Sequence, residues 1–156
     1  MFKKNLIMFI LVLIAGVVTM AFNTLSNEND TAVDEVRSLV EAAYLNGAFN
    51  DLDTESMRTG FHRKFAIFSA QGEELRKYPI KSWIAGIEKR KAQEDFDPNS
   101  QKWDYEFKYI DVTGGSAAVK IELYKKSQLI YTDYLSLLKF ESGWKIVAKV
   151  YHKHVD

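Results

Sequence analysis

The sequence predicts an α+β domain in which three helices precede and cover a curved antiparallel sheet. Helical periodicity is confined to the first part of the chain, around one predicted hairpin, whereas the last third alternates apolar and polar residues as strands do. The chain has 156 residues, 47% of them hydrophobic and 27% charged, which suits one globular domain behind a leader. Helices and strands segregated in this way are typical of the α+β class.

Residues 1–21 have the pattern of a secretory signal peptide. Lys3 and Lys4 precede an uncharged run, Leu6–Phe22, and a small residue, Ala21, stands at the expected cleavage site. We therefore expect export, to the periplasm or the extracellular space. An uncleaved leader would instead anchor the protein, and it is the only membrane contact that the sequence predicts. Residues 22–30 are polar and aperiodic, as in a linker.

Two helices are predicted next. The first begins at Thr31, where Thr31 and Asp34 fit a capping box. Its apolar positions recur every three or four residues, at Val33, Val36, Leu39, Val40, Ala43 and Tyr44. After a break rich in capping residues, a short second helix is predicted around Glu55–Arg58.

A hairpin and a third helix follow. Phe61–Ala70 and Leu75–Tyr78 are predicted strands on either side of the turn Gln71-Gly72. Pro79 suits the first position of a helix. The third helix has an apolar stripe formed by Ile80, Trp83, Ile84 and Ile87.

The last third is predicted to be a four-stranded meander. Gly114-Gly115, a polar turn, and Glu141-Ser142-Gly143 separate its strands. The predicted strands are Trp103–Tyr109, Ala117–Tyr124, Ile130–Phe140 and Trp144–His152.

Composition argues against several classes of function. Lys+Arg and Asp+Glu are both 21, so no basic excess indicates nucleic-acid binding. The sequence contains no Cys, which excludes disulfides, a thiol nucleophile and a thiolate zinc site. It also contains no P-loop, no G-x-G-x-x-G and no H-E-x-x-H, so we expect no cofactor.

This order of elements resembles the cone-shaped fold of the nuclear transport factor 2-like superfamily, which includes SnoaL-like cyclases and ketosteroid isomerases. The Phe61-His62 step and the strands Tyr131–Lys139 and Gly143–His152 resemble, more specifically, the bacterial "putative lumazine-binding" family. The resemblance assigns residues 31–156 to this domain. It implies a pocket for a small organic ligand between the helices and the concave side of the sheet.

Strand alternation predicts which residues line that pocket. A three-residue loop at 141–143 pairs Phe140 with Trp144 and places Thr132, Tyr134 and His152 on the concave side. The convex side then carries an exposed Asp133–Lys149 ion pair. It also carries an apolar set that predicts a homodimer interface: Tyr131, Leu135, Leu137, Val147 and Tyr151. A one-residue error in the loop would exchange the two faces.

The favoured function is binding of a small molecule without catalysis. Aromatic side chains at Tyr44, Trp83, Tyr105 and Tyr134 are the predicted ligand contacts. Such rings suit a flat heterocycle, for example a pteridine or a flavin.

Two alternatives remain open. One is an enzyme of the SnoaL or ketosteroid isomerase type, with His62 or His152 as the base and a Tyr as the donor. The other is a structural dimer module that acts only through its convex face. No metal site is expected, because His62, His152 and His154 have no carboxylate at a convincing ligand spacing.

Overall fold

The computed structural model describes residues 28–97 and 102–154. The chain divides into two compact units, Met1–Ala32 and Val33–Asp156. In the first unit residues 28–32 are α-helical, so helical structure is present at residues 28–30, where the sequence predicted a linker. The predicted leader, residues 1–21, lies outside the described residues. Within the described ranges, no helix is long and apolar enough to span a membrane.

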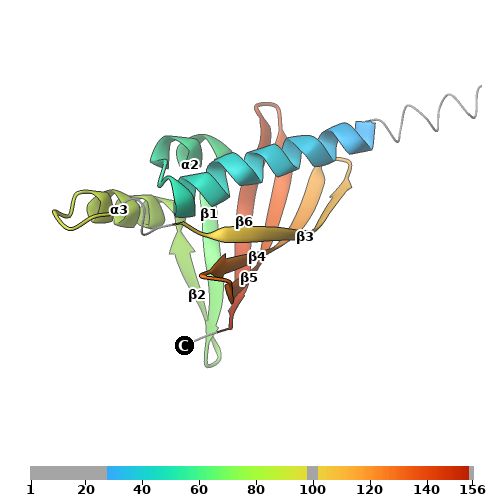
Figure 1. Cartoon of the computed structure of the whole chain (residues 1–156). Helices are drawn as coiled ribbons and strands as arrows, with labels where there is room; N and C mark the ends of the chain where they lie inside the picture. The colour runs from blue at the N-terminus through green and yellow to red at the C-terminus, as the bar shows by residue number, and fades with distance from the viewer. Residues whose placement is uncertain (1–27, 98–101, 155–156) are drawn as a thin grey trace, which may run out of the picture. The chain divides into compact units, whose positions relative to one another are not determined.

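The second unit begins with helical structure that crosses the sheet (Figure 1). Residues 33–39 are α-helical, and η1 (Val40–Asn50) is wound as a π-helix. The π-type hydrogen bonding reaches the helix end, where the amide of Asp51 donates to the carbonyl of Asn46 at 2.9 Å. The face of η1 that is turned inward includes Val40, Ala43, Tyr44 and Leu45, all of them buried.

Two shorter helices follow as predicted. In α2 (Thr54–Gly60), the side chain of Asp53 caps the first turn by accepting from the amides of Glu55 and Ser56. Gly60 lets α2 approach η1 closely, because a Cβ there would lie 2.2 Å from the Cβ of Ala43. In α3 (Ile80–Lys91), the predicted stripe is buried at Ile80, Ile84 and Ile87.

Six strands form one mixed sheet in the order β2-β1-β6-β5-β4-β3. Only the β1–β6 pairing is parallel among the pairings in the described ranges. The strands are β1 (Phe61–Gln71), β2 (Glu74–Pro79), β3 (Asp104–Thr113), β4 (Ser116–Lys125), β5 (Gln128–Phe140) and β6 (Gly143–Lys153). The predicted hairpin and four-stranded meander are therefore confirmed.

The two faces of the sheet differ in burial. The inner face, turned toward the helices, contains the buried side chains Val119, Ile121, Leu123, Leu135, Leu137 and Ile146. The outer face contains Tyr109, Tyr134, Leu138, Phe140 and Val150, each 39–49% exposed.

The predicted assignment of faces on β5 was wrong. The loop between β5 and β6 has two residues rather than three, since Phe140 pairs with Gly143 and Lys139 pairs with Trp144. Gly143 has a φ of +96°, a conformation that favours glycine. This one-residue difference turns Asp133, Leu135 and Leu137 inward and Thr132, Tyr134 and Ser136 outward, because side chains alternate along a strand.

A β-bulge in β6 produces a second reversal. Leu137 pairs with Ile146 but Ser136 pairs with Ala148, so Val147 is the extra residue. The prediction was therefore correct for Trp144 and Ile146, which are buried, and wrong beyond Val147. Beyond Val147, the residues that face inward are Lys149 and Tyr151, whereas the predicted register had placed Ala148 and Val150 there.

Candidate functional site

Three polar side chains meet inside the second unit. The hydroxyl of Tyr44, from η1, donates to Oδ2 of Asp133 on β5. Lys149 Nζ, from β6, lies 3.0 Å from Asp133 Oδ1 and donates to the Tyr44 hydroxyl oxygen at 2.6 Å. Tyr44 and Asp133 are 0% exposed and Lys149 is 5% exposed. We call these residues the Tyr44–Asp133–Lys149 network.

Register explains how these side chains meet. Lys149 pairs across the strands with Leu135, and Tyr151 pairs with Asp133. Lys149 is therefore the diagonal neighbour of Asp133 on the inner face, a distance that a long side chain can span. The sequence predicted this pairing but placed it in solvent. The two-residue loop and the bulge at Val147 bring it into the interior.

Burial shifts the proton affinities of the network. Burial, followed by the nearby Asp133 carboxylate, raises the pKa of the Tyr44 phenol well above its ordinary value. Burial also lowers the pKa of the Lys149 amine, although the Asp133 charge opposes this shift. Both shifts have burial as the largest cause, as expected where an ionised group loses its water.

Aromatic rings surround the Lys149 amine. Their centroids lie between 5.0 and 5.9 Å from Nζ and belong to Tyr44, Tyr151, Phe49, Trp83 and Tyr131. A cation at this distance from ring faces is attracted by their quadrupoles. These contacts hold the amine at one place in the interior.

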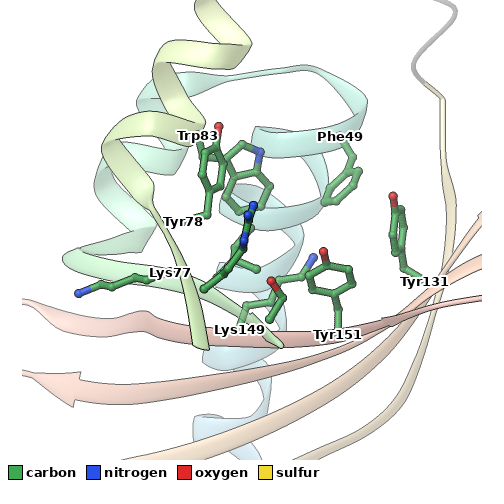
Figure 2. A pocket seen from close by; sticks show the side chains of 10 residues that line it. Phe49, Lys77, Tyr78, Trp83, Tyr131, Lys149 and Tyr151 are labelled. Atoms are coloured by element: carbon green, nitrogen blue, oxygen red, sulfur yellow. The ribbon is translucent and has the colours of Figure 1, made fainter. Parts of the chain in front are cut away.

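A cavity of about 440 Å³ lies between β2, α3 and β6 and opens beside this amine. Figure 2 shows Trp83, Phe49, Tyr131 and Tyr151 arranged around Lys149. The cavity is lined by Phe49, Ile67, Ser69, Arg76, Lys77, Tyr78, Trp83, Tyr131, Lys149 and Tyr151. A second cavity of about 520 Å³ shares Phe49, Trp83 and Tyr131 with the first, so these rings separate the two.

The network retains hydrogen-bonding capacity toward this cavity. An ammonium group has three donors, and Lys149 directs one to Tyr44 and approaches Asp133 with another. Asp133 Oδ1 is buried and accepts no well-directed hydrogen bond from the described residues, in spite of its ion pair with Lys149. Such a site suits a ligand that has both an apolar ring and a polar edge.

The structure brings two of the predicted ligand contacts to this site. Trp83 lines the cavity, and Tyr44 lies behind Lys149 within the network. Tyr134 lies on the outer face, 40% exposed, beneath the amine of Lys120. Tyr105 is 40% exposed beside Phe107 and lines none of the cavities described above.

The histidines lie away from the network. His62 stacks on Phe140 at 5.1 Å, on the outer side of the sheet. His152 pairs with Thr132 and is exposed, with its ring 4.6 Å from that of His154. Neither His62 nor His152 lines the cavity beside Lys149. Among the described residues, no group of three or more His, Asp or Glu side chains could hold a metal ion.

Sequence reasoning missed Asp133, Lys149, Phe49, Tyr131 and Tyr151 as site residues. A signal was present in β5, where alternate residues Tyr131, Leu135 and Leu137 are apolar and Asp133 interrupts them. A carboxylate within an apolar alternating set is costly to bury unless it has a partner. That cost points to a buried cation, and Lys149 is its diagonal neighbour.

The curved sheet and its covering helices define a fold of the nuclear transport factor 2-like type, which is compatible with small-molecule binding. The chain belongs to the "Putative lumazine-binding" family, whose match covers residues 31–152. The expectation from the strand sequences is thereby confirmed. No curated protein matches the chain.

Solved structures agree with this fold. A nuclear transport factor 2-like protein from Shewanella baltica is 29% identical, with a TM-score of 0.60, over 80% of this chain and 97% of that one. One from Methylobacillus flagellatus is 25% identical, with a TM-score of 0.59, over 79% and 92%. A third, from Silicibacter pomeroyi, is 22% identical, with a TM-score of 0.60, over 80% and 98%. All three are described as proteins of unknown function.

Proposed function

We propose that this protein binds a flat aromatic molecule in the cavity beside Lys149. The observation that carries this proposal is that aromatic side chains line the cavity around one buried amine, which has an unused hydrogen-bond donor. The rings supply apolar contact with a planar ligand. The amine selects a ligand whose edge presents a hydrogen-bond acceptor, such as a ring carbonyl. Pteridine-2,4-dione (lumazine) has both features, and the family description supports its use as a probe.

Titration with lumazine, monitored by isothermal titration calorimetry, tests this function. Trp83→Leu removes a ring from the cavity wall, and we expect it to weaken binding at least tenfold. Tyr134→Leu is the matched control, because Tyr134 lies on the outer face, and it should leave affinity unchanged. Equal loss in both variants, or no binding of lumazine and no ligand retained by the native protein, would contradict the proposal.

Native mass spectrometry of the chain expressed from Phe22 would find a retained ligand directly. The proposal predicts extra mass that disappears on denaturation. The same spectrum reports whether the protein is a dimer. The mass of the released molecule would identify its chemical class without any prior choice of probe.

We also propose export. Lys3, Lys4 and the apolar run Leu6–Phe22 support a secretory leader. Expression of the full chain in a bacterium, followed by fractionation and N-terminal sequencing, tests this. A mature chain that begins at Phe22 in the periplasm or the medium is expected. Recovery of the full-length chain in the membrane would indicate the uncleaved anchor instead.

A second candidate function is acid–base catalysis. The Tyr44–Asp133–Lys149 network favours it, since the Lys149 amine lines the cavity and can exchange a proton with a bound carbonyl compound, while Tyr44 and Asp133 behind it hold the amine in place. These residues would replace the His base of the sequence-based hypothesis. Isomerisation of 3-cyclohexenone to the conjugated enone, measured by absorbance, is a simple assay. A rate that Tyr44→Phe leaves unchanged would contradict catalysis at this site.

We propose that the homodimer forms through the outer face. The set predicted from sequence cannot serve, because Leu135 and Leu137 are 1% exposed. The exposed apolar residues Tyr109, Tyr134 and Val150 lie in one row across the sheet, linked by Lys120. An exposed row of large side chains of this kind suits a second copy of the chain. Val150→Lys should give a monomer by light scattering, whereas Leu75→Lys, on the edge strand β2, should not.

A further inference from the structure

The charges along the cavity wall have one sign. Arg76, Lys77 and Lys149 belong to its wall and no Asp or Glu does, although the amine of Lys77 points away from the rings (Figure 2). The whole sequence has equal numbers of basic and acidic residues, so this local excess is a property of the site. Lys149 is paired with Asp133 behind the wall. Arg76 is exposed and, among the described residues, forms neither an ion pair nor a side-chain hydrogen bond, so its guanidinium group is available to a ligand.

Strand register directs Arg76 rather than Lys77 toward the cavity. Arg76 pairs with Ser69 of β1, and Tyr78 pairs with Ile67. All four residues line the cavity, as expected for neighbours on one face. Lys77 pairs with Phe68 on the opposite face, and Figure 2 shows its side chain extending away from the rings.

We propose that the ligand is an aromatic carboxylate, whose acidic group is bound by Arg76 while its ring lies among Trp83, Tyr131 and Tyr151. This inference rests on the proposed function and adds the charge of the ligand. A guanidinium group matches a carboxylate in shape and can donate two parallel hydrogen bonds to it. The hydroxyl of Ser69, the cross-strand neighbour of Arg76, provides one more donor at the same end of the cavity.

Two probes of equal shape test the charge. 2-Naphthoate and 2-naphthamide differ in the charge of one substituent on the same flat ring. At 50 mM salt, we expect the native protein to bind 2-naphthoate about tenfold more tightly than 2-naphthamide, because only the carboxylate can form charge-assisted hydrogen bonds with Arg76. Raising the salt concentration to 0.5 M should reduce this preference, because Arg76 is exposed to solvent.

Arg76→Gln should abolish the preference for 2-naphthoate and leave the affinity for 2-naphthamide unchanged. Lys77→Gln is the matched control, on the same strand with its side chain on the other face, and it should retain the preference. If the native protein binds both probes equally, the charge inference is wrong and the proposed function stands. If neither probe binds, lumazine does not bind and no ligand is retained in the native mass spectrum, the proposed function itself fails. Loss of preference in both variants would assign the effect to general charge rather than to Arg76.

Discussion

The inner face of β5 and β6 has two halves that differ in chemistry. The half nearest the turn between these strands is aliphatic, with Leu137 beside Ile146. The half beyond the bulge contains Asp133, Lys149 and Tyr151, and it borders the cavity. Residues 33–50 contact both halves, through Glu35 with Trp144 near the turn and through Tyr44 with Asp133 beyond the bulge. The covering helix therefore does not explain the difference. The difference shows that one extra residue, Val147, separates the filled core from the half that borders the cavity.

Asp133→Ala should produce the largest loss of stability. It leaves the Lys149 amine buried without its carboxylate partner, and removal of one member of a buried pair costs about 3–5 kcal/mol. Chemical denaturation measured by circular dichroism gives the free energy of unfolding. A loss below about 1 kcal/mol would show that Lys149 reaches water or loses its proton at little cost.

Leu137→Ala should produce the second-largest loss of stability, and it tests the aliphatic half of the inner face. Leu137 is 1% exposed, so its truncation leaves a cavity and costs about 2–5 kcal/mol, here expected near 3. At a temperature where the variant is folded, lumazine binding should match that of the native protein. Loss of binding in the folded variant would mean that the two halves are coupled.

Asp53→Ala should cost about 1 kcal/mol through loss of the α2 cap. The side-chain hydrogen bond from Ser56 lowers the pKa of Asp53 below its ordinary value of 3.8. The carboxylate therefore adds stability fully above pH 3.8, and this contribution is lost as the pH falls through the lowered value. Asp53→Asn retains a good cap and should remove only the dependence on pH, which denaturation at pH 2 to 7 would measure. An equal pH dependence in both proteins would assign it to other carboxylates.

The smallest effect on stability is expected for the triple variant Tyr44→Phe, Asp133→Leu, Lys149→Met. Replacing a whole buried polar network by apolar residues of similar volume is often neutral or stabilising. We therefore expect the free energy of unfolding to fall by less than about 1 kcal/mol, or to rise, together with loss of lumazine binding. A folded triple variant that still binds lumazine would show that the rings alone make the site.

Local patterns were enough to predict the elements. The stripe at Ile80, Ile84 and Ile87 depends only on spacing within one helix, and the alternation in β4 depends only on one strand. The cap at Asp53 and the turn at Gly72 are also local. These features predicted three helices, a hairpin and a meander in the observed order.

The inner and outer faces could not be predicted in this way, because a face depends on register. The two-residue turn reversed β5 throughout, and the bulge reversed β6 only beyond Val147. Tyr134 was therefore predicted as a ligand contact and lies outside, whereas Asp133 was predicted outside and is fully buried.

The sequence by itself determined the class of fold, because that class follows from the order and periodicity of segments. The family came from the resemblance of particular stretches, above all the strands around residues 131–139 and 143–152, to the putative lumazine-binding family. It also contained the residues of the network and the diagonal relation of Asp133 to Lys149. Only the tertiary structure decided that this pair is buried, that Tyr44 joins it and that aromatic rings enclose the amine. The physical reason is that side chains alternate at every residue of a strand, so one inserted residue exchanges core and solvent without changing the pattern of elements.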